Sequence, residues 1–384
     1  MEFDLSEEQR MVKDLARKFS DEEIAPVARE NDRNEHFPRE IIQKMAELGL
    51  LGGPVPEEYG GGGLDYITYA MIVEEIGRGC SSVRTTISVQ LSLVALTLLK
   101  WGNEEQKRKY LPALCSAKII GCFGLTEPGA GSDPSGMATT ARKVDGGWVL
   151  NGAKTWISNG GVADMAIVFA QADPSLKHKG ITAFLIDKGT SGFSTRDIHG
   201  KLGLRASNTA ELFLQEVRVS DDAILGKVGD GFKIAMSALD SGRYSVAAGC
   251  VGIIQASIEA STKYAHERRQ FGRPIGTFQL VQEKIARMAV DCEAARLLVF
   301  KAGHQKNKGV RSTLETSMAK YFATEAALRA ADEAVQIHGG YGYSDEYPVE
   351  RYLRDARVAT IYEGTSEIQK LIIGSYITGM KAFT

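Results

Sequence analysis

The chain has 384 residues and a formal net charge of −2, because lysine and arginine are nearly balanced by aspartate and glutamate. This balance leaves no basic excess for nucleic acid, and the length exceeds what one hydrophobic core usually takes, so we expect two or three structural units. The five cysteines and six histidines are scattered without metal-ligand spacing, so we expect reduced core thiols and no metal site.

Residues 1–117 are predicted to form an N-terminal helical domain. Ser6 to Gln9 is a capping box, and an apolar stripe at helical spacing runs from Val12 to Phe19. Further helices are expected over about 39–48, 67–77, 88–99 and 103–114.

The first residues of the chain and the length of its apolar runs predict the cellular location of the protein. The acidic segment Met1 to Leu5 lacks the basic region of a signal or transit peptide. No apolar run approaches the roughly 20 residues that a membrane-spanning helix needs, so we expect no membrane insertion. We therefore expect a cytoplasmic bacterial protein, or a mitochondrial matrix protein whose presequence has been removed.

Residues 118–226 are predicted to form a middle β domain, because the apolar period changes to two after Ile119. Val144 to Leu150 is typical of a hairpin with a glycine turn, and buried strands are expected at 166–170 and 181–186. No helical pattern separates the strands, which favours a small antiparallel barrel or sandwich over βαβ units.

Residues 227–384 return to long helical patterns, over roughly 230–265, 278–305, 312–338 and 365–380. Four long helices with short connections indicate a four-helix bundle. The predicted fold class is therefore mainly α with a middle β domain.

One carboxylate, Glu363, lies between a charged run and an apolar helix. Gly364 allows a positive φ and a close ligand, and Thr365 or Ser366 can cap the following helix. A carboxylate on a tight loop at a helix N-terminus can serve as a general base. An ordinary surface-loop glutamate is the alternative.

Other segments carry polar groups that could hold a ligand, although each also has a purely structural explanation. Leu125 to Asp133 is a loop of glycines and hydroxyls that could present N–H groups to a phosphate or ring edge, or be a plain turn. Trp156 with Ser158 could stack on a flat cofactor or line a barrel wall. Arg268 to Gly272 could bind pyrophosphate or end a helix in solvent, and Gln336 to Gly340 ends a helix with glycines.

Taken together, in this order and at these spacings, the motifs resemble those of the acyl-CoA dehydrogenase family over nearly the whole chain. The resemblance rests on Leu125–Asp133, Trp156–Ser158, Arg268–Gly272, Gln336–Gly340 and Tyr362–Glu367. It implies the acyl-CoA dehydrogenase fold, with an N-terminal helical domain, an antiparallel β-barrel or sandwich and a C-terminal four-helix bundle. It also implies a homotetramer, a dimer of dimers, that binds FAD non-covalently across a subunit interface.

The resemblance assigns a role to each matching residue. The flavin ring would contact Phe123, Leu125, Thr126, Gly131, Ser132, Trp156, Ile157 and Ser158. The adenosine pyrophosphate of a neighbour's FAD would contact Arg268, Phe271, Gln279, Gln336, Ile337, Gly339 and Gly340, and Thr365 and Glu367 would complete the cofactor site. The acyl-CoA substrate would meet Ser132, Asp240, Arg243, Tyr362 and Gly364.

The implied reaction is α,β-dehydrogenation of an acyl-CoA thioester. Glu363 would remove the α-proton, and burial would raise its pKa toward the operating pH. Backbone and cofactor hydrogen bonds to the thioester oxygen would stabilise the developing enolate. FAD would take the β-hydrogen as hydride and pass the electrons to electron-transferring flavoprotein.

Arg84 is the residue that bears on the choice of acyl group. A buried guanidinium needs an anion or several acceptors, and the family's acyl pocket is normally apolar there. The glutaryl-CoA dehydrogenase branch has an arginine followed four residues later by serine, as Arg84 and Ser88 are here, with Thr85 between them. We therefore expect a dicarboxylyl-CoA substrate such as glutaryl-CoA. The alternative is an Arg84 paired with Glu74 or Glu75.

Several readings stay open. The glutaryl branch has a pocket glutamate seven residues before its arginine, where this chain has Gly77, so a benzylsuccinyl-CoA type of substrate is an alternative. Decarboxylation after oxidation is unsettled. A short- or branched-chain acyl-CoA dehydrogenase, an acyl-CoA oxidase and a non-catalytic homologue that binds a partner are the remaining alternatives.

Overall fold

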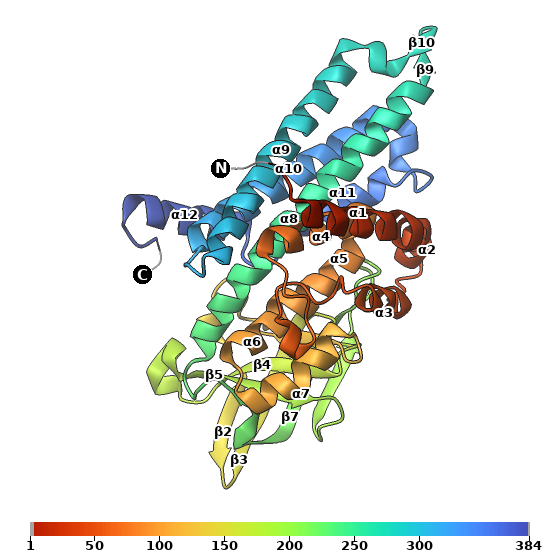
Figure 1. Ribbon diagram of the computed structural model, residues 1–384. Helices are drawn as coiled ribbons and strands as arrows, with labels where there is room; N and C mark the ends of the chain where they lie inside the picture. Colours follow the sequence, from red (N-terminus) through yellow and green to blue (C-terminus); the bar gives the residue numbers. More distant parts are fainter. Residues whose placement is uncertain (1–3, 383–384) are drawn as a thin grey trace.

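The computed structural model describes residues 4–382 and has helical, β and helical parts in chain order (Figure 1). The long helix α8, Gly231–Glu267, runs from the β part to the far end of the molecule and links all three. The fold class is the predicted one, and the sheet lies at the opposite end from the tip where α8 ends and α9, Gln279–Asn307, begins.

The N-terminal part holds seven α-helices, whose bounds are α1 Glu7–Phe19, α2 Ala25–Arg33, α3 Arg39–Glu47, α4 Tyr66–Gly79, α5 Ser81–Ile87, α6 Leu96–Trp101 and α7 Glu104–Cys115. The predicted capping box is present, since Ser6 accepts from Gln9 N and Gln9 returns the bond. The helix α2 was not anticipated.

The segment Ser81–Trp101 is continuous, with a π-helical stretch at Ser88–Ala95 between α5 and α6. It is long and apolar enough to cross a membrane by length and composition, which the sequence analysis overlooked because polar residues interrupt it. In this structure 94% of its most apolar window is buried, so it is a core helix here.

The middle part is one eight-stranded sheet with the order β6-β7-β3-β2-β4-β5-β8, and β1 beside β4. Its strands are β1 Gly121–Gly124, β2 Thr140–Val144, β3 Gly147–Ser158, β4 Met165–Gln171, β5 Ile181–Asp187, β6 Phe193–Asp197, β7 Thr209–Ser220 and β8 Ile224–Leu225. The predicted hairpin is β2–β3, turning at Gly146 with φ 73°. Most pairings are antiparallel as expected, but β1 and β2 each pair with β4 in parallel.

The C-terminal part contains α8, α9 Gln279–Asn307, α10 Thr313–His338, α11 Val349–Ala359 and α12 Ser366–Thr378. The short strands β9 Arg269–Gln270 and β10 Arg273–Pro274 join α8 to α9 at the far tip. The helix α11 was not anticipated, and α12 projects from the side of the other helices (Figure 1).

Glycines let α4 and α8 cross at close range. A Cβ on Gly77 would lie 2.7 Å from the carbonyl oxygen of Gly249, and one on Gly252 would lie 2.2 Å from that of Glu74. No side chain fits between the two backbones there, so the crossing holds α5 and its flanking residues at a set depth against α8.

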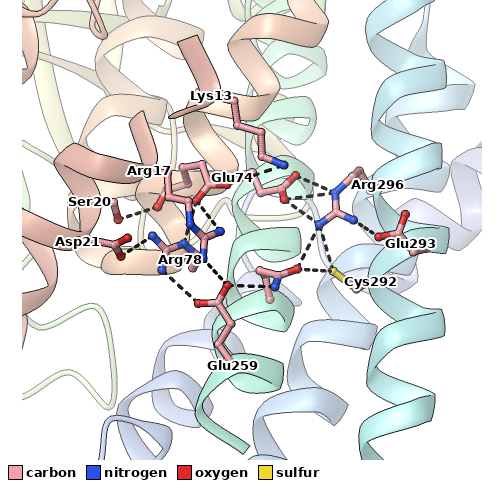
Figure 2. A network of polar contacts seen from close by, with 12 residues as sticks. Lys13, Arg17, Ser20, Asp21, Glu74, Arg78, Glu259, Cys292, Glu293 and Arg296 are labelled. Atoms are coloured by element: carbon pink, nitrogen blue, oxygen red, sulfur yellow. Dashed lines mark hydrogen bonds and ion pairs between the residues drawn. The ribbon is translucent and has the colours of Figure 1, made fainter. Parts of the chain in front are cut away.

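A network of ion pairs ties α1, α4, α8 and α9 together (Figure 2). Glu74 accepts from Arg296 at 2.8 Å, and Glu75 accepts from Arg78 at 2.8 Å. Arg78 also pairs with Asp21 and Glu259, at 2.6 and 3.2 Å. The two buried acids of α4 are therefore each paired with an arginine, Glu74 with Arg296 of α9 and Glu75 with Arg78 of α4 itself.

Candidate active site

Glu363 lies in the short turn between α11 and α12. Its φ is 54° and that of Gly364 is 88°, so two successive residues adopt the left-handed region that disfavours a side chain. Thr365 is the N-cap of α12 and accepts from Ile368 N at 3.3 Å. The turn points the Glu363 side chain inward toward α8.

The Glu363 carboxylate is buried at its tip. The oxygen Oε2 is inaccessible and has no hydrogen-bond partner among residues 4–382. Burial raises the pKa of Glu363 to about 7, although Arg243, Lys320 and Arg84 oppose that rise. A Cβ on Gly242 would lie 1.9 Å from Oε2, so the glycine in α8 is what gives the carboxylate room.

The main chain of the turn is held by three side chains that converge on its carbonyl groups. Arg243 Nε donates to Glu363 O at 3.2 Å, and Lys320 Nζ donates to Gly364 O at 2.9 Å. Gln369 Nε2 donates to both carbonyl oxygens, at 3.3 and 3.0 Å. Lys320, Gln369 and Gly242 were missed as site residues, although a lysine inside the apolar stretch of α10 was a visible signal.

The predicted substrate residues Asp240 and Arg243 lie one turn apart on α8 and pair with each other. Arg243 Nη1 donates to Asp240 Oδ1 at 3.0 Å, and Thr313 donates to the other oxygen at 2.7 Å. Asp240 therefore orients Arg243 and also contacts the start of α10.

Arg84 reaches the same region from α5. Its side chain is 1% exposed, and Nη2 donates to the hydroxyl of Tyr362 at 2.9 Å. A Cβ on Gly249 would lie 2.5 Å from Arg84 Cδ, so α8 leaves a glycine where the guanidinium passes. Burial is the main cause that raises the pKa of Tyr362, which stays a neutral phenol beside the cation.

Two polar atoms near Arg84 lack partners. Arg84 Nε and Ser88 Oγ are buried and form no hydrogen bond within the described part of the chain. Thr85 differs, because its hydroxyl donates to Ser81 O at 2.9 Å. The alternative that Arg84 pairs with Glu74 or Glu75 is wrong, since those acids bind Arg296 and Arg78.

The residues predicted to hold the flavin ring gather on the β part. Thr155 N donates to Thr126 O at 2.9 Å and joins the two predicted loops. A buried ion pair between Lys154 and Glu127, at 2.7 Å, lies beneath them and was not anticipated. Glu127 also accepts from the N–H groups of Ala138 and Thr139.

Among the apolar residues of these segments, the indole of Trp156 is exposed. Trp156 is 62% exposed with φ 59°, while Phe123 and Leu125 are almost buried. An exposed indole face is suited to cover a flat aromatic ring. Gly131, Ser132, Ile157 and Ser158 lie on the same two segments.

A second group lies at the far end of α8. Arg268, Ile337, Gly339 and Gly340 line a pocket of about 610 Å³ together with Tyr264, Gln270, Ile275, His338, Tyr341, Ser344 and Glu346. Phe271 is 92% exposed. Gln279, at the start of α9, and Gln336, directly before Ile337, are exposed as well. Arg243 lies within α8, and Arg268 is the residue directly after its end, 25 positions later. At a rise of about 1.5 Å per residue, the helix separates the two residues by about 38 Å. One chain therefore does not bring this group to Glu363.

The three-part fold and the inward glutamate define a class of flavoenzymes, and comparison with known proteins agrees. Models of the acyl-CoA dehydrogenase N-terminal, middle and C-terminal domains match residues 6–118, 122–217 and 229–378. The chain belongs to the acyl-CoA dehydrogenase family. It is an acyl-CoA dehydrogenase, an FAD-dependent oxidoreductase.

Two relatives with different names are about equally similar to this chain. An acyl-CoA dehydrogenase of Bacillus subtilis is 48% identical, with 98% of this chain and 99% of the relative covered. A glutaryl-CoA dehydrogenase of Desulfococcus multivorans is 46% identical, with 97% of each covered.

Solved structures of acyl-CoA dehydrogenases named for different substrates also share the fold of this chain. Butyryl-CoA dehydrogenase from Megasphaera elsdenii has a TM-score of 0.96 at 42% identity, with 98% of this chain and all of that chain covered. Glutaryl-CoA dehydrogenase from Mycobacterium smegmatis in complex with FADH2 has a TM-score of 0.94 at 37% identity, covering 99% and 97%.

Proposed function

We propose that this enzyme oxidises a dicarboxylyl-CoA thioester, such as glutaryl-CoA, to its 2,3-enoyl-CoA, with Glu363 as the base. The observation that supports the substrate class is Arg84. It is a fully buried cation whose hydrogen-bond partner is a neutral phenol, and Nε beside it is unpaired among residues 4–382. A distal carboxylate would satisfy Arg84 Nε and Ser88 Oγ together.

Glu363 has the surroundings that a base for a weakly acidic C–H requires. Its buried oxygen Oε2 is free to accept a proton, and its pKa near 7 makes it a stronger base than an exposed glutamate. Its own N–H takes part in no hydrogen bond of residues 4–382, so it can donate to the thioester oxygen as negative charge develops there. Arg243, held by Asp240, would bind the CoA portion.

The chain's own residues fit FAD on both parts of the molecule. The exposed Trp156 face and the adjacent loop hydroxyls suit the flavin ring, and the Arg268 pocket suits a pyrophosphate. Thr365 and Glu367, at the start of α12, would complete the site. When bound, FAD supplies the acceptor for the hydride that leaves the β-carbon.

We further propose that a second copy of the chain completes each cofactor site. Arg268 lies about 38 Å along the α8 axis from Arg243, which contacts the Glu363 turn, so the pyrophosphate-side residues of one subunit do not reach a flavin bound beside its own Glu363. Apolar side chains exposed on α9 and α12 support an assembly of copies, among them Leu280, Val290, Leu371 and Ile377. A homotetramer that passes electrons to electron-transferring flavoprotein, in the bacterial cytoplasm or the mitochondrial matrix, is the proposed working form.

A short- or branched-chain acyl-CoA is the second candidate substrate, and a benzylsuccinyl-CoA type is a third. The close crossing of Gly77 with Gly249 leaves no space for a glutamate at position 77, which counts against glutaryl-CoA itself as the substrate. The pocket would therefore bind the distal carboxylate without an acidic neighbour from position 77. Decarboxylation after oxidation is a separate question, which the product decides.

The test is anaerobic reduction of the bound flavin by a panel of CoA esters. Glutaryl-CoA, butyryl-CoA, isovaleryl-CoA and benzylsuccinyl-CoA are mixed with the purified enzyme, and loss of visible flavin absorption is followed together with product mass. Faster reduction by a dicarboxylyl ester supports the proposal. Reduction by butyryl-CoA alone would contradict the proposed substrate class and leave the family activity intact.

A further inference from the structure

Lys320 is a buried cation that the mechanism above does not use. It lies in the first third of α10 and is 0% exposed. Its neighbours one turn away, Thr316, Ala323 and Thr324, are fully buried too, so the side chain has little freedom. A lysine is almost never fully buried unless its ammonium has a specific partner.

The partner of Lys320 is the active-site turn. Nζ donates to the carbonyl oxygen of Gly364 at 2.9 Å, and Lys320 forms no ion pair among residues 4–382. Arg243, the other cation on the turn, shares its charge with Asp240. Lys320 thus brings a positive charge to the turn that no carboxylate within 4.0 Å neutralises.

The turn needs such support. A non-glycine residue with positive φ has a strained backbone and persists only where the surroundings hold it. Glu363 has φ 54° and Gly364 has φ 88°. The two carbonyl oxygens are held from α8 by Arg243, from α12 by Gln369 and from α10 by Lys320, so three helices contribute one donor each.

Other charged and titratable groups face this turn from each element around it. They are Tyr69 on α4, Arg84 on α5, Arg243 and Cys250 on α8, Lys320 and Glu325 on α10, Glu367 on α12, and Tyr362 beside Glu363 itself. Burial lowers the pKa of Lys320 to about 8, so the ammonium is mostly charged at pH 7. Glu325 is bonded to Ser366 Oγ at 2.5 Å.

We propose that Lys320 is a positioning residue for the dehydrogenation, which holds the Glu363–Gly364 turn in its left-handed conformation and presents an unshared positive charge to the Glu363 carboxylate. The inference rests on the assignment of Glu363 as the base. Lys320 does not touch the substrate, so its effect is on kcat and on the pH profile more than on KM.

The test compares Lys320→Met and Lys320→Gln with Thr324→Val in the FAD-loaded enzyme. Thr324 Oγ1 donates to Lys320 O at 2.8 Å, one helical turn away, so its replacement perturbs the same part of α10 and leaves the ammonium in place. With the best acyl-CoA, Lys320→Met is expected to lower kcat about tenfold while KM stays within about threefold. The acid limb of kcat/KM should move up by about one pH unit, because loss of a nearby cation destabilises the carboxylate.

Lys320→Gln separates the two roles. Its amide can still donate to Gly364 O, so kcat should recover in part, while the displaced acid limb should remain because the charge is gone. Thr324→Val should keep both wild-type values. The inference would be overturned if Lys320→Met kept the wild-type kcat and an unmoved acid limb. If the methionine variant does not fold, the same result in Lys320→Gln would overturn it.

Glu363→Gln distinguishes this inference from the proposal beneath it. If Glu363→Gln stays active, the assignment of the base is wrong. If Glu363→Gln is inactive while the Lys320 variants behave as wild type, only the role of Lys320 is wrong.

Discussion

Replacing Arg84 by methionine should separate substrate choice from stability. The change removes a fully buried guanidinium and keeps a long apolar side chain. A hydrogen bond to a charged group contributes about 1.5–3 kcal/mol. Arg84 has Nε unpaired and Nη2 on a phenol within residues 4–382, so loss of the substrate carboxylate contact should reach about 3 kcal/mol. This corresponds to a fall of about a hundredfold in kcat/KM for glutaryl-CoA.

The same reasoning predicts that Arg84→Met changes neither the activity on a neutral acyl-CoA nor the stability of the fold by much. The value of kcat/KM for butyryl-CoA should stay within about threefold, because a neutral acyl chain makes no bond to the guanidinium. The free energy of unfolding should not fall, since Arg84 has no carboxylate partner in the described structure and a buried cation replaced by an apolar group is often neutral or stabilising.

Arg78→Met is the matched control for stability. Arg78 is also buried, but it pairs with Glu75, Asp21 and Glu259, so its loss should cost about 3 kcal/mol. The assays are steady-state kinetics with an artificial acceptor and urea denaturation of both variants. Equal losses on glutaryl-CoA and butyryl-CoA in Arg84→Met, or destabilisation as large as in Arg78→Met, would refute the reasoning.

Three further predictions follow from the site. Because burial raises the pKa of Glu363 to about 7 and only the carboxylate accepts the α-proton, kcat/KM should rise with pH through a limb near 7; a limb near the ordinary glutamate value of 4.5 would contradict this. Gly242→Ala should lower kcat about a hundredfold through displacement of Oε2, without a loss of melting temperature, since alanine favours the helix; unchanged kcat would show that the glycine does not matter. Glu127→Gln should lower the free energy of unfolding by about 3 kcal/mol in urea titration and weaken FAD binding, because it leaves the buried Lys154 unpaired; stability equal to wild type would count against that pair.

Local patterns predicted the features that depend on neighbours in sequence. The capping box at Ser6 and the hairpin at Gly146 each satisfy their own hydrogen bonds within a few residues, so the sequence carries them directly. The long helices of the C-terminal part were predicted for the same reason. The loop of Glu363 and the cap at Thr365 were also recognisable from residue types alone.

Features that depend on distant contacts were not predictable in this way. The parallel pairing of β1 with β4 joins strands about forty positions apart, and no local period encodes it. The room that Gly242 and Gly249 make for Glu363 and Arg84 depends on how α8 packs against other elements. Helix α11 was missed because its charged residues conceal a one-sided apolar face, with Val349 and Ala356 buried.

The central claim is that the Glu363 carboxylate removes the α-proton, and its direct test is anaerobic mixing of Glu363→Gln with the best CoA ester. The amide cannot accept a proton, so flavin reduction should slow by about a thousandfold, while the flavin spectrum of the free enzyme and the affinity for the ester are retained. Flavin reduction at the wild-type rate in this variant would contradict the account.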